Sequence, residues 1–232
     1  AHRGFWWPDR SRGNSLVAIR AAFTAGFGVE VDVRRCLPSD GEGFVLAHDL
    51  PAFDTQRLHS WNDFLNLAWA ADPTLPILVN VKEAGTEAQI AWDLRAHGLT
   101  ARAWLFDFEL CGADPLLAKA AAPEVRLLAR VSDRAETGLA ADVLPVLPHW
   151  ASGVWLDQQD TDWVTAEAIA AWHGLGAEVF IASPELHGRT LDLARTEGWR
   201  GADGVCTDVP HLVQRVLAGD ERLRSTSIWW GE

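Results

Sequence analysis

The chain has 232 residues, a hydrophobic fraction of 48% and a formal net charge of −12 at neutral pH. A chain of this length and composition buries a large core without disulfides, as globular proteins do. The acidic balance excludes general binding to nucleic acid or anionic membranes, because both need a basic surface. No apolar run is long enough for a transmembrane helix and no signal peptide is visible, so we expect a cytoplasmic protein without a membrane span.

Two residue counts add to this picture. The three cysteines, Cys36, Cys111 and Cys206, are odd in number and far apart, which favours a reduced compartment over a disulfide framework or a CxxC metal site. Lysine is scarce, because Lys82 and Lys119 are the only two, whereas the chain carries 13 Trp and no Tyr.

Short apolar strands alternate with helical segments along the chain. Buried strands are predicted over 28–34, 77–82, 103–109, 125–132, 152–158, 178–183 and 203–208, each rich in Val, Ile, Leu, Phe or Trp. Asn14 is expected to cap a first helix over 16–26, and Ser60 to begin a second. Further helices are predicted over 86–96, 166–172, 191–195 and 211–217, and 43–49 is expected to form a hairpin-like segment.

This alternation, without any shift in composition, indicates one α/β domain over residues 1–232. Eight such units at this length predict a (βα)8 TIM barrel, whose first strand is short or truncated because only 1–4 are available for it. A doubly wound open sheet is the alternative, and it is disfavoured because no GxGxxG and no P-loop follows the first strand.

Polar residues at the ends of these strands carry the functional signal, because the carboxyl ends of barrel strands form the active face. Glu30 and Asp32 lie two apart, as do Asn80 with Lys82, and Asp107 with Glu109. Residues two apart on a strand project to the same side, so the first pair makes a hard oxygen site suited to Mg2+ or Ca2+. A lysine at a strand end binds phosphate, forms a Schiff base or pairs with nearby acids.

Five segments, read in order, resemble motifs of the glycerophosphodiester phosphodiesterase family. The chain is similar to a small bacterial member of the phospholipase-C-like phosphodiesterase superfamily of TIM barrels. They are AHRG at the N-terminus, GVEVDVR, GFVLAHD, NVK and GADGVCTDVP, and they extend from His2 to Pro210. The resemblance implies hydrolysis of a small phosphodiester, either a glycerophosphodiester or a related, polysaccharide-linked one. It also implies a divalent metal, Mg2+ or Ca2+, as cofactor.

The resemblance further implies residue roles. His2 and His48 match the acid/base histidines, and Arg3 and Lys82 match residues that bind phosphate. Glu30, Asp32 and Asn80 match the metal ligands. In similar enzymes a neighbouring hydroxyl attacks phosphorus and a cyclic phosphate forms. The segment 183–189 resembles an element of small bacterial members in which Glu185, His187 and Arg189 would bind a substrate head group.

Two departures from the family pattern keep other functions open. Asn80 stands where the family usually has a glutamate, which removes one negative charge from the metal site. The segment 34–59 is shorter than the insertion that many members carry there. The alternatives are a lyase or aldolase that uses Lys82 as a Schiff base, and a non-catalytic barrel that binds carbohydrate or phosphate. The oligomeric state is not indicated.

Overall fold

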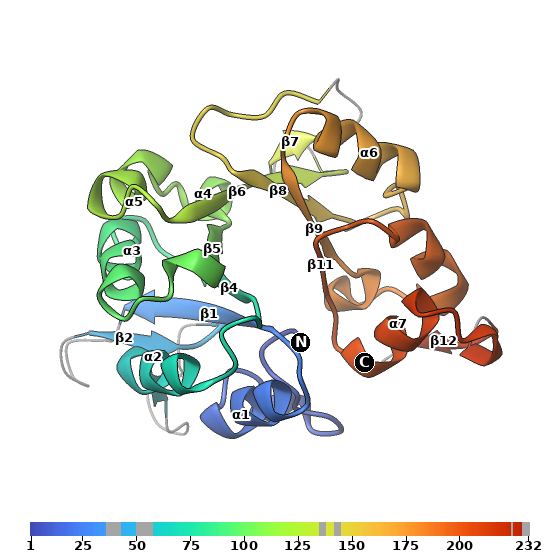
Figure 1. Cartoon of the computed structure of the whole chain (residues 1–232), viewed down its shortest axis with the longest axis horizontal. Helices are drawn as coiled ribbons and strands as arrows, with labels where there is room; N and C mark the ends of the chain where they lie inside the picture. The colour runs from blue at the N-terminus through green and yellow to red at the C-terminus, as the bar shows by residue number, and fades with distance from the viewer. Residues whose placement is uncertain (36–42, 50–57, 135–137, 142–144, 224, 229–232) are drawn as a thin grey trace. The chain divides into compact units, whose positions relative to one another are not determined.

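The computed structural model describes residues 1–35, 43–49, 58–134, 138–141, 145–223 and 225–228, so Cys36 lies outside the described residues. The fold is mixed α/β with a mostly parallel arrangement of strands (Figure 1). The chain divides into two compact units, Ala1–Leu127 and Leu128–Glu232. Among the described residues, no helix is long and apolar enough to cross a membrane.

The first unit is built on parallel strands. β1 (Val29–Arg35) pairs with β4 (Ile77–Val81), β4 with β5 (Ala103–Phe106), and β5 with the first residues of β6 (Arg126–Ser132). On the other edge of β1, β2 (Phe44–Leu46) and β3 (His59–Ser60) pair in antiparallel fashion. The helices of this unit are α1 (Leu16–Thr24), α2 (Trp61–Ala70), α3 (Glu87–Ala96), α4 (Phe108–Cys111) and α5 (Pro115–Ala121), with 3-10 turns η1 (Arg10–Arg12) and η3 (Thr100–Arg102).

The second unit contains the rest of β6, which pairs with β7 (Leu139–Ala140) and β8 (Gly153–Asp157). β9 (Glu178–Ala182) pairs with both β8 and β11 (Gly204–Cys206), and all these pairings are parallel. The remaining elements are α6 (Ala166–Gly174), α7 (Pro210–Leu217), the 3-10 segments η5 (Pro184–His187), η6 (Leu193–Trp199) and η7 (Glu221–Leu223), and the antiparallel pair β10 (Leu191–Asp192) with β12 (Ser227–Ile228).

Alternation along the strands separates the core from the polar residues. In β1, Val29, Val31 and Val33 are buried in the core, whereas Glu30 and Asp32 project to the opposite face. In the parallel register of β1 and β4, Asp32 lies opposite Asn80. The second unit has its own core, formed by Val154, Leu156, Val179 and Ile181 with residues that include Trp172, Trp199 and Val213.

All seven predicted strands and the main helices are confirmed, with local corrections. Ser15, not Asn14, caps α1, because its side chain accepts a hydrogen bond from the Ala18 amide. The strand predicted over 103–109 ends at Phe106, because Asp107 adopts a left-handed conformation with φ of 68° and Glu109 then lies in α4. The helix predicted over 191–195 is a short strand followed by η6.

The first strand is as short as expected. His2 forms a single parallel bridge with Glu30, and the Glu30 amide donates to the Ala1 carbonyl at 2.9 Å. This bridge is sufficient to place the side chains of residues 2 and 3 beside β1.

Gly153 offers a test of the packing between β8 and β9. A Cβ at this position would lie 2.2 Å from the Glu178 carbonyl oxygen, whereas a Cβ on Gly174 would meet nothing within 4 Å. We expect Gly153→Ala to lower the free energy of unfolding by about 1–3 kcal/mol. Gly174→Ala, on α6, should raise it slightly, by up to about 1 kcal/mol. Urea denaturation of both variants checks this, and equal stabilities would contradict the register of β8 and β9.

Candidate active site and a second polar cluster

The first unit buries the carboxylate of Asp32 beside two cationic side chains and one hydrogen-bond donor. Arg3 Nε lies 2.9 Å from Oδ2, Lys82 Nζ lies 3.6 Å from Oδ1, and Asn14 Nδ2 donates to Oδ2 at 2.9 Å. Burial alone would raise the pKa of Asp32, but the two cations and the Asn14 hydrogen bond outweigh it and hold that pKa below its ordinary value. Asp32 is therefore the fixed negative charge of the site.

Glu30 lies two residues earlier on β1 in a different electrostatic environment. Its Oε2 accepts a hydrogen bond from the Arg3 amide at 3.2 Å and lies 3.9 Å from His2 Nε2. Burial, together with the charge of Asp32, raises the pKa of Glu30 to about 8. Near neutral pH and without a bound cation, this carboxyl is mostly protonated.

The two predicted catalytic histidines both belong to the first unit, where His2 lies 3.9 Å from Glu30 and the charge of Asp32 acts on His48. His2 is buried, and the indole N–H of Trp6 donates to its carbonyl at 3.0 Å, which anchors its backbone. The His48 carbonyl accepts a hydrogen bond from Arg34 Nε at 2.9 Å.

The His48 ring is oriented by its neighbour in the chain. Nδ1 lies 2.8 Å from the Asp49 carboxylate, so that nitrogen carries the proton and Nε2 presents its lone pair. Burial, together with Arg3 and Lys82, lowers the pKa of His48 below its ordinary value. His48 is therefore neutral at physiological pH and able to accept a proton.

Asn14 is the residue of this site whose role the sequence did not reveal. Its amide group bonds Asp32 twice, because Nδ2 donates to the carboxylate and Oδ1 accepts from the Asp32 amide at 3.1 Å. Its φ of 61° is left-handed, as is the φ of 54° at Arg3, and the Asn14 amide donates to the Arg3 carbonyl at 2.9 Å. Asparagine tolerates this conformation better than most residues. An asparagine in a loop close to the His-Arg-Gly segment at residues 2–4 was therefore the sequence signal that could have indicated this role.

The oxygen atoms that would hold a divalent cation fit the chemistry of Mg2+ or Ca2+. Asp32 Oδ1 and Asn80 Oδ1 are buried and accept no hydrogen bond among the described residues, although Lys82 lies near the former. Together with the Glu30 carboxyl they form a set of hard oxygen donors on two adjacent strands. Within the described part of the chain, no cluster of three His, Cys, Asp or Glu side chains forms a metal site.

The second unit holds the remaining predicted residues in a polar cluster of its own. Glu185 is fully buried; Ser183 Oγ donates to Oε2, and Thr207 Oγ1 and the Asp208 amide donate to Oε1. Burial raises the pKa of Glu185 despite these bonds. Both carboxylate oxygens are thus engaged within the protein.

Arg189 is engaged in the same way. Its guanidinium donates to the Gln158 carbonyl at 3.0 Å, to the Thr161 carbonyl at 3.1 Å and to the Asp162 carboxylate at 2.6 Å. These bonds tie the loop after β9 to the loop after β8, as expected of a residue that holds loop structure.

His187 differs, because one ring nitrogen remains available. Its Nε2 bonds the buried carboxylate of Asp157, which also accepts from Arg130 and, at 2.8 Å, from Gln159. Burial opposes ionisation of Asp157, but the hydrogen bond from His187 and the charge of Arg130 hold its pKa below the ordinary value. Nε2 faces the ionised carboxylate, and Nδ1 makes no hydrogen bond to the described residues in a side chain that is 27% exposed.

Comparison with known proteins supports the fold. No protein-family model matches the chain, and no curated protein matches its sequence. Among solved structures, a candidate glycerophosphodiester phosphodiesterase from Galdieria sulphuraria superposes with a TM-score of 0.69 at 16% identity, covering 94% of this chain and 96% of that one.

Two further structures give the same result. A glycerophosphodiester phosphodiesterase from Parabacteroides distasonis has a TM-score of 0.65 at 17% identity, with 94% and 95% of the two chains covered. One from Agrobacterium tumefaciens has a TM-score of 0.62 at 17% identity, with 92% and 97% covered. The chain therefore shares the fold of these structures along almost its whole length.

The role of Asn14 can be tested with its backbone conformation preserved. Asn14→Gly keeps the left-handed backbone but removes both bonds to Asp32, and we expect it to lower the free energy of unfolding by about 1–3 kcal/mol, because a buried charged acceptor loses its donor. Asn14→Asp should destabilise more, since it sets a second carboxylate against Asp32. Thermal and urea unfolding measure both, and a neutral Asn14→Gly would show that Arg3 and Lys82 alone stabilise the carboxylate.

The raised pKa of Glu30 predicts how stability depends on pH. The folded protein holds this proton up to about pH 8, whereas the unfolded chain releases it near the ordinary pKa of a glutamate. The stabilisation from the protonated carboxyl is therefore complete below that ordinary pKa and is lost as the pH rises through about 8. In chelator, the free energy of unfolding should therefore fall between pH 5 and 8, approximately. Glu30→Gln should flatten this slope. An unchanged slope in the variant would contradict the assignment.

Proposed function

We propose that this protein is a metal-dependent phosphodiesterase that hydrolyses a glycerophosphodiester or a related phosphodiester. The observation that carries the proposal is the 3.9 Å approach of His2 to Glu30, with Arg3 and Lys82 paired to Asp32 and with His48 in the electrostatic surroundings of Asp32. The fold shared with glycerophosphodiester phosphodiesterase structures supports it.

The charges of the site suit an anionic substrate on an otherwise acidic protein. With Glu30 protonated, Arg3 and Lys82 outweigh Asp32 by one positive charge. A local cation is needed, because a net charge of −12 repels a phosphodiester at long range. Arg3 and Lys82 would hold the phosphoryl oxygens and stabilise the charge that develops on them.

The two histidines would transfer the protons. His48 Nε2 takes the proton of a substrate hydroxyl next to the phosphate, and that oxygen forms a bond to phosphorus. The bond from phosphorus to the leaving alcohol breaks, and His2 protonates the departing oxygen. Water then opens the cyclic phosphate with the histidine roles reversed. The lowered pKa of His48 supports its role as the first base.

Glu30, Asp32 and Asn80 would hold a divalent cation of the hard type, Mg2+ or Ca2+. Such a cation supplies Lewis-acid stabilisation of the phosphoryl charge when it is bound. The buried oxygens of Asp32 and Asn80 that accept no hydrogen bond from the described residues support this assignment.

We further propose that residues 1–232 form a single (βα)8 barrel domain. The regular alternation of parallel strands and helices supports this, as does a likeness to solved structures that extends over 94% of the chain.

The role proposed for Lys82, as a positive charge and not as a Schiff base, follows from its contact with Asp32 at 3.6 Å. An ion-paired ammonium is a charge partner, whereas a Schiff-base lysine must lose its proton.

The two histidines provide the direct test. On glycerophosphoethanolamine and glycerophosphoglycerol with added Mg2+ or Ca2+, we expect His2→Ala and His48→Ala each to lower kcat/KM by about 10²–10⁴. His149→Ala is the control, because His149 is exposed and lies outside both polar clusters. Circular dichroism checks folding. Full activity in both variants would refute the acid/base assignment, and activity that persists in chelator would refute the metal. A folded protein inactive on every phosphodiester would favour the non-catalytic barrel.

A further inference from the structure

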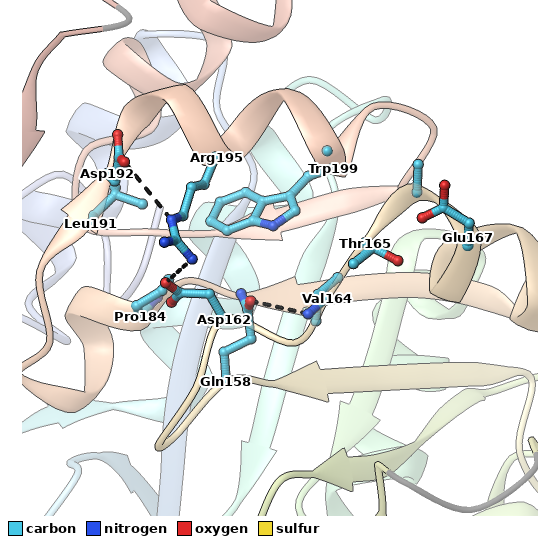
Figure 2. A pocket seen from close by; sticks show the side chains of 12 residues that line it. Gln158, Asp162, Val164, Thr165, Glu167, Pro184, Leu191, Asp192, Arg195 and Trp199 are labelled. Carbon is cyan, nitrogen blue, oxygen red and sulfur yellow. Dashed lines mark hydrogen bonds and ion pairs between the residues drawn. The ribbon is translucent and has the colours of Figure 1, made fainter.

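A cavity of about 400 Å³ lies within the second unit, and its lining includes Asp162, the carboxylate partner of Arg189. Its walls come from the loop after β8, the start of α6, β10 and η6 (Figure 2). This volume is in the range of small-molecule sites. The phosphodiesterase chemistry proposed above makes no use of it.

The inner wall of the cavity is apolar but offers one hydrogen-bond donor. Leu191, Val164 and Trp199 line it and are each at least nine-tenths buried. The Trp199 indole N–H has no acceptor among the described residues, and Figure 2 shows its nitrogen on the side of the cavity where Val164 and Thr165 lie. This N–H is not among the buried polar atoms that lack a partner, so it opens into the cavity, where a ligand atom that accepts a hydrogen bond would meet it.

The rim of the cavity carries charges of both signs. Arg195 NH1 lies 2.7 Å from the Asp162 carboxylate, and its Nε lies 3.8 Å from Asp192 (Figure 2). Glu167 lines the opposite side. The rim thus has three carboxylates and two guanidinium groups, those of Arg195 and of Arg189, which binds Asp162. The net charge of these five groups is −1.

These features select the ligand by charge and by hydrogen bonding. An anion would be repelled by the three carboxylates, and a simple organic cation has no acceptor for the Trp199 N–H. A neutral polyhydroxylated ligand satisfies both demands, because a hydroxyl accepts from Trp199 or Arg195 and donates to Asp192 or Glu167. Its C–H face would pack on the apolar wall.

We propose that this cavity is a binding site for a neutral sugar or polyol of monosaccharide size. Polar contacts alone would be weak in such an exposed rim, so affinity depends on the buried wall and the indole donor together. For a ligand of monosaccharide size, we expect binding in the millimolar range.

Gly198 allows the cavity to be filled without a steric clash. It lines the cavity, and a Cβ built on it would meet nothing within 4 Å. Gly198→Leu therefore places a side chain where the ligand would lie. Gly174→Leu is the matched control, because a Cβ there also meets nothing within 4 Å but Gly174 does not line the cavity. Trp199→Phe removes the donor and keeps an aromatic wall.

The experiment uses saturation-transfer NMR and calorimetry on the full chain with glucose, galactose, mannose and N-acetylglucosamine, and with glucose 6-phosphate and glucosamine as charged comparators. We expect at least one neutral sugar to bind saturably and more tightly than either comparator. Gly198→Leu should abolish this binding, Gly174→Leu should retain it, and Trp199→Phe should weaken it by about 2–10-fold, the loss of one hydrogen bond.

Three results would overturn the proposal: no saturable binding of any neutral sugar, undiminished binding by Gly198→Leu, or tighter binding of glucose 6-phosphate than of glucose. If Gly198→Leu fails to fold by circular dichroism, Ala166→Leu narrows the same cavity from the exposed start of α6. The measurement requires no hydrolysis, so its outcome is independent of the phosphodiesterase proposal.

Discussion

The first unit is organised around the need to bury an ionised Asp32. Removing a carboxylate from water costs several kcal/mol unless charges and hydrogen bonds replace the solvent. Here Arg3 comes from the N-terminal turn, Asn14 from the loop before α1 and Lys82 from the end of β4. Three segments distant in sequence are thus held in place by one carboxylate, and the groups that compensate its burial are the groups that would bind a phosphodiester.

The same constraint explains the strain near the N-terminus. Arg3 and Asn14 both adopt left-handed backbone conformations, which are unfavourable for residues with a side chain. In return, the Arg3 amide reaches Glu30 while its guanidinium reaches Asp32, and Asn14 bonds both the side chain and the backbone of Asp32. The strain is maintained because relaxing either residue would leave a buried acceptor without its donor.

The sequence predicted the strands well, because alternation and apolar runs are local properties. It also predicted which strand-end residues would meet in the first unit, since i and i+2 spacing on paired parallel strands determines which side chains share a face. It misassigned Asn14 as a helix cap, because asparagine suits both roles and the choice depends on Asp32, 18 residues away. The Asp157–His187 pair spans 30 residues and depends on how two loops fold, which no local pattern encodes.

Asn80 shows how the electrostatics of the site form one balance. In the family pattern that the chain resembles, a third acid at this position would add a negative charge beside Asp32 and would require a cation to offset it. An amide in its place leaves the charges of Arg3 and Lys82 in slight excess over that of Asp32 while Glu30 is protonated. Under the proposed function, the buried Asn80 oxygen would still offer a ligand to a cation, and that cation would also have to displace the proton of Glu30. Weaker metal binding and a stronger intrinsic attraction for phosphate would then both follow from the amide at position 80.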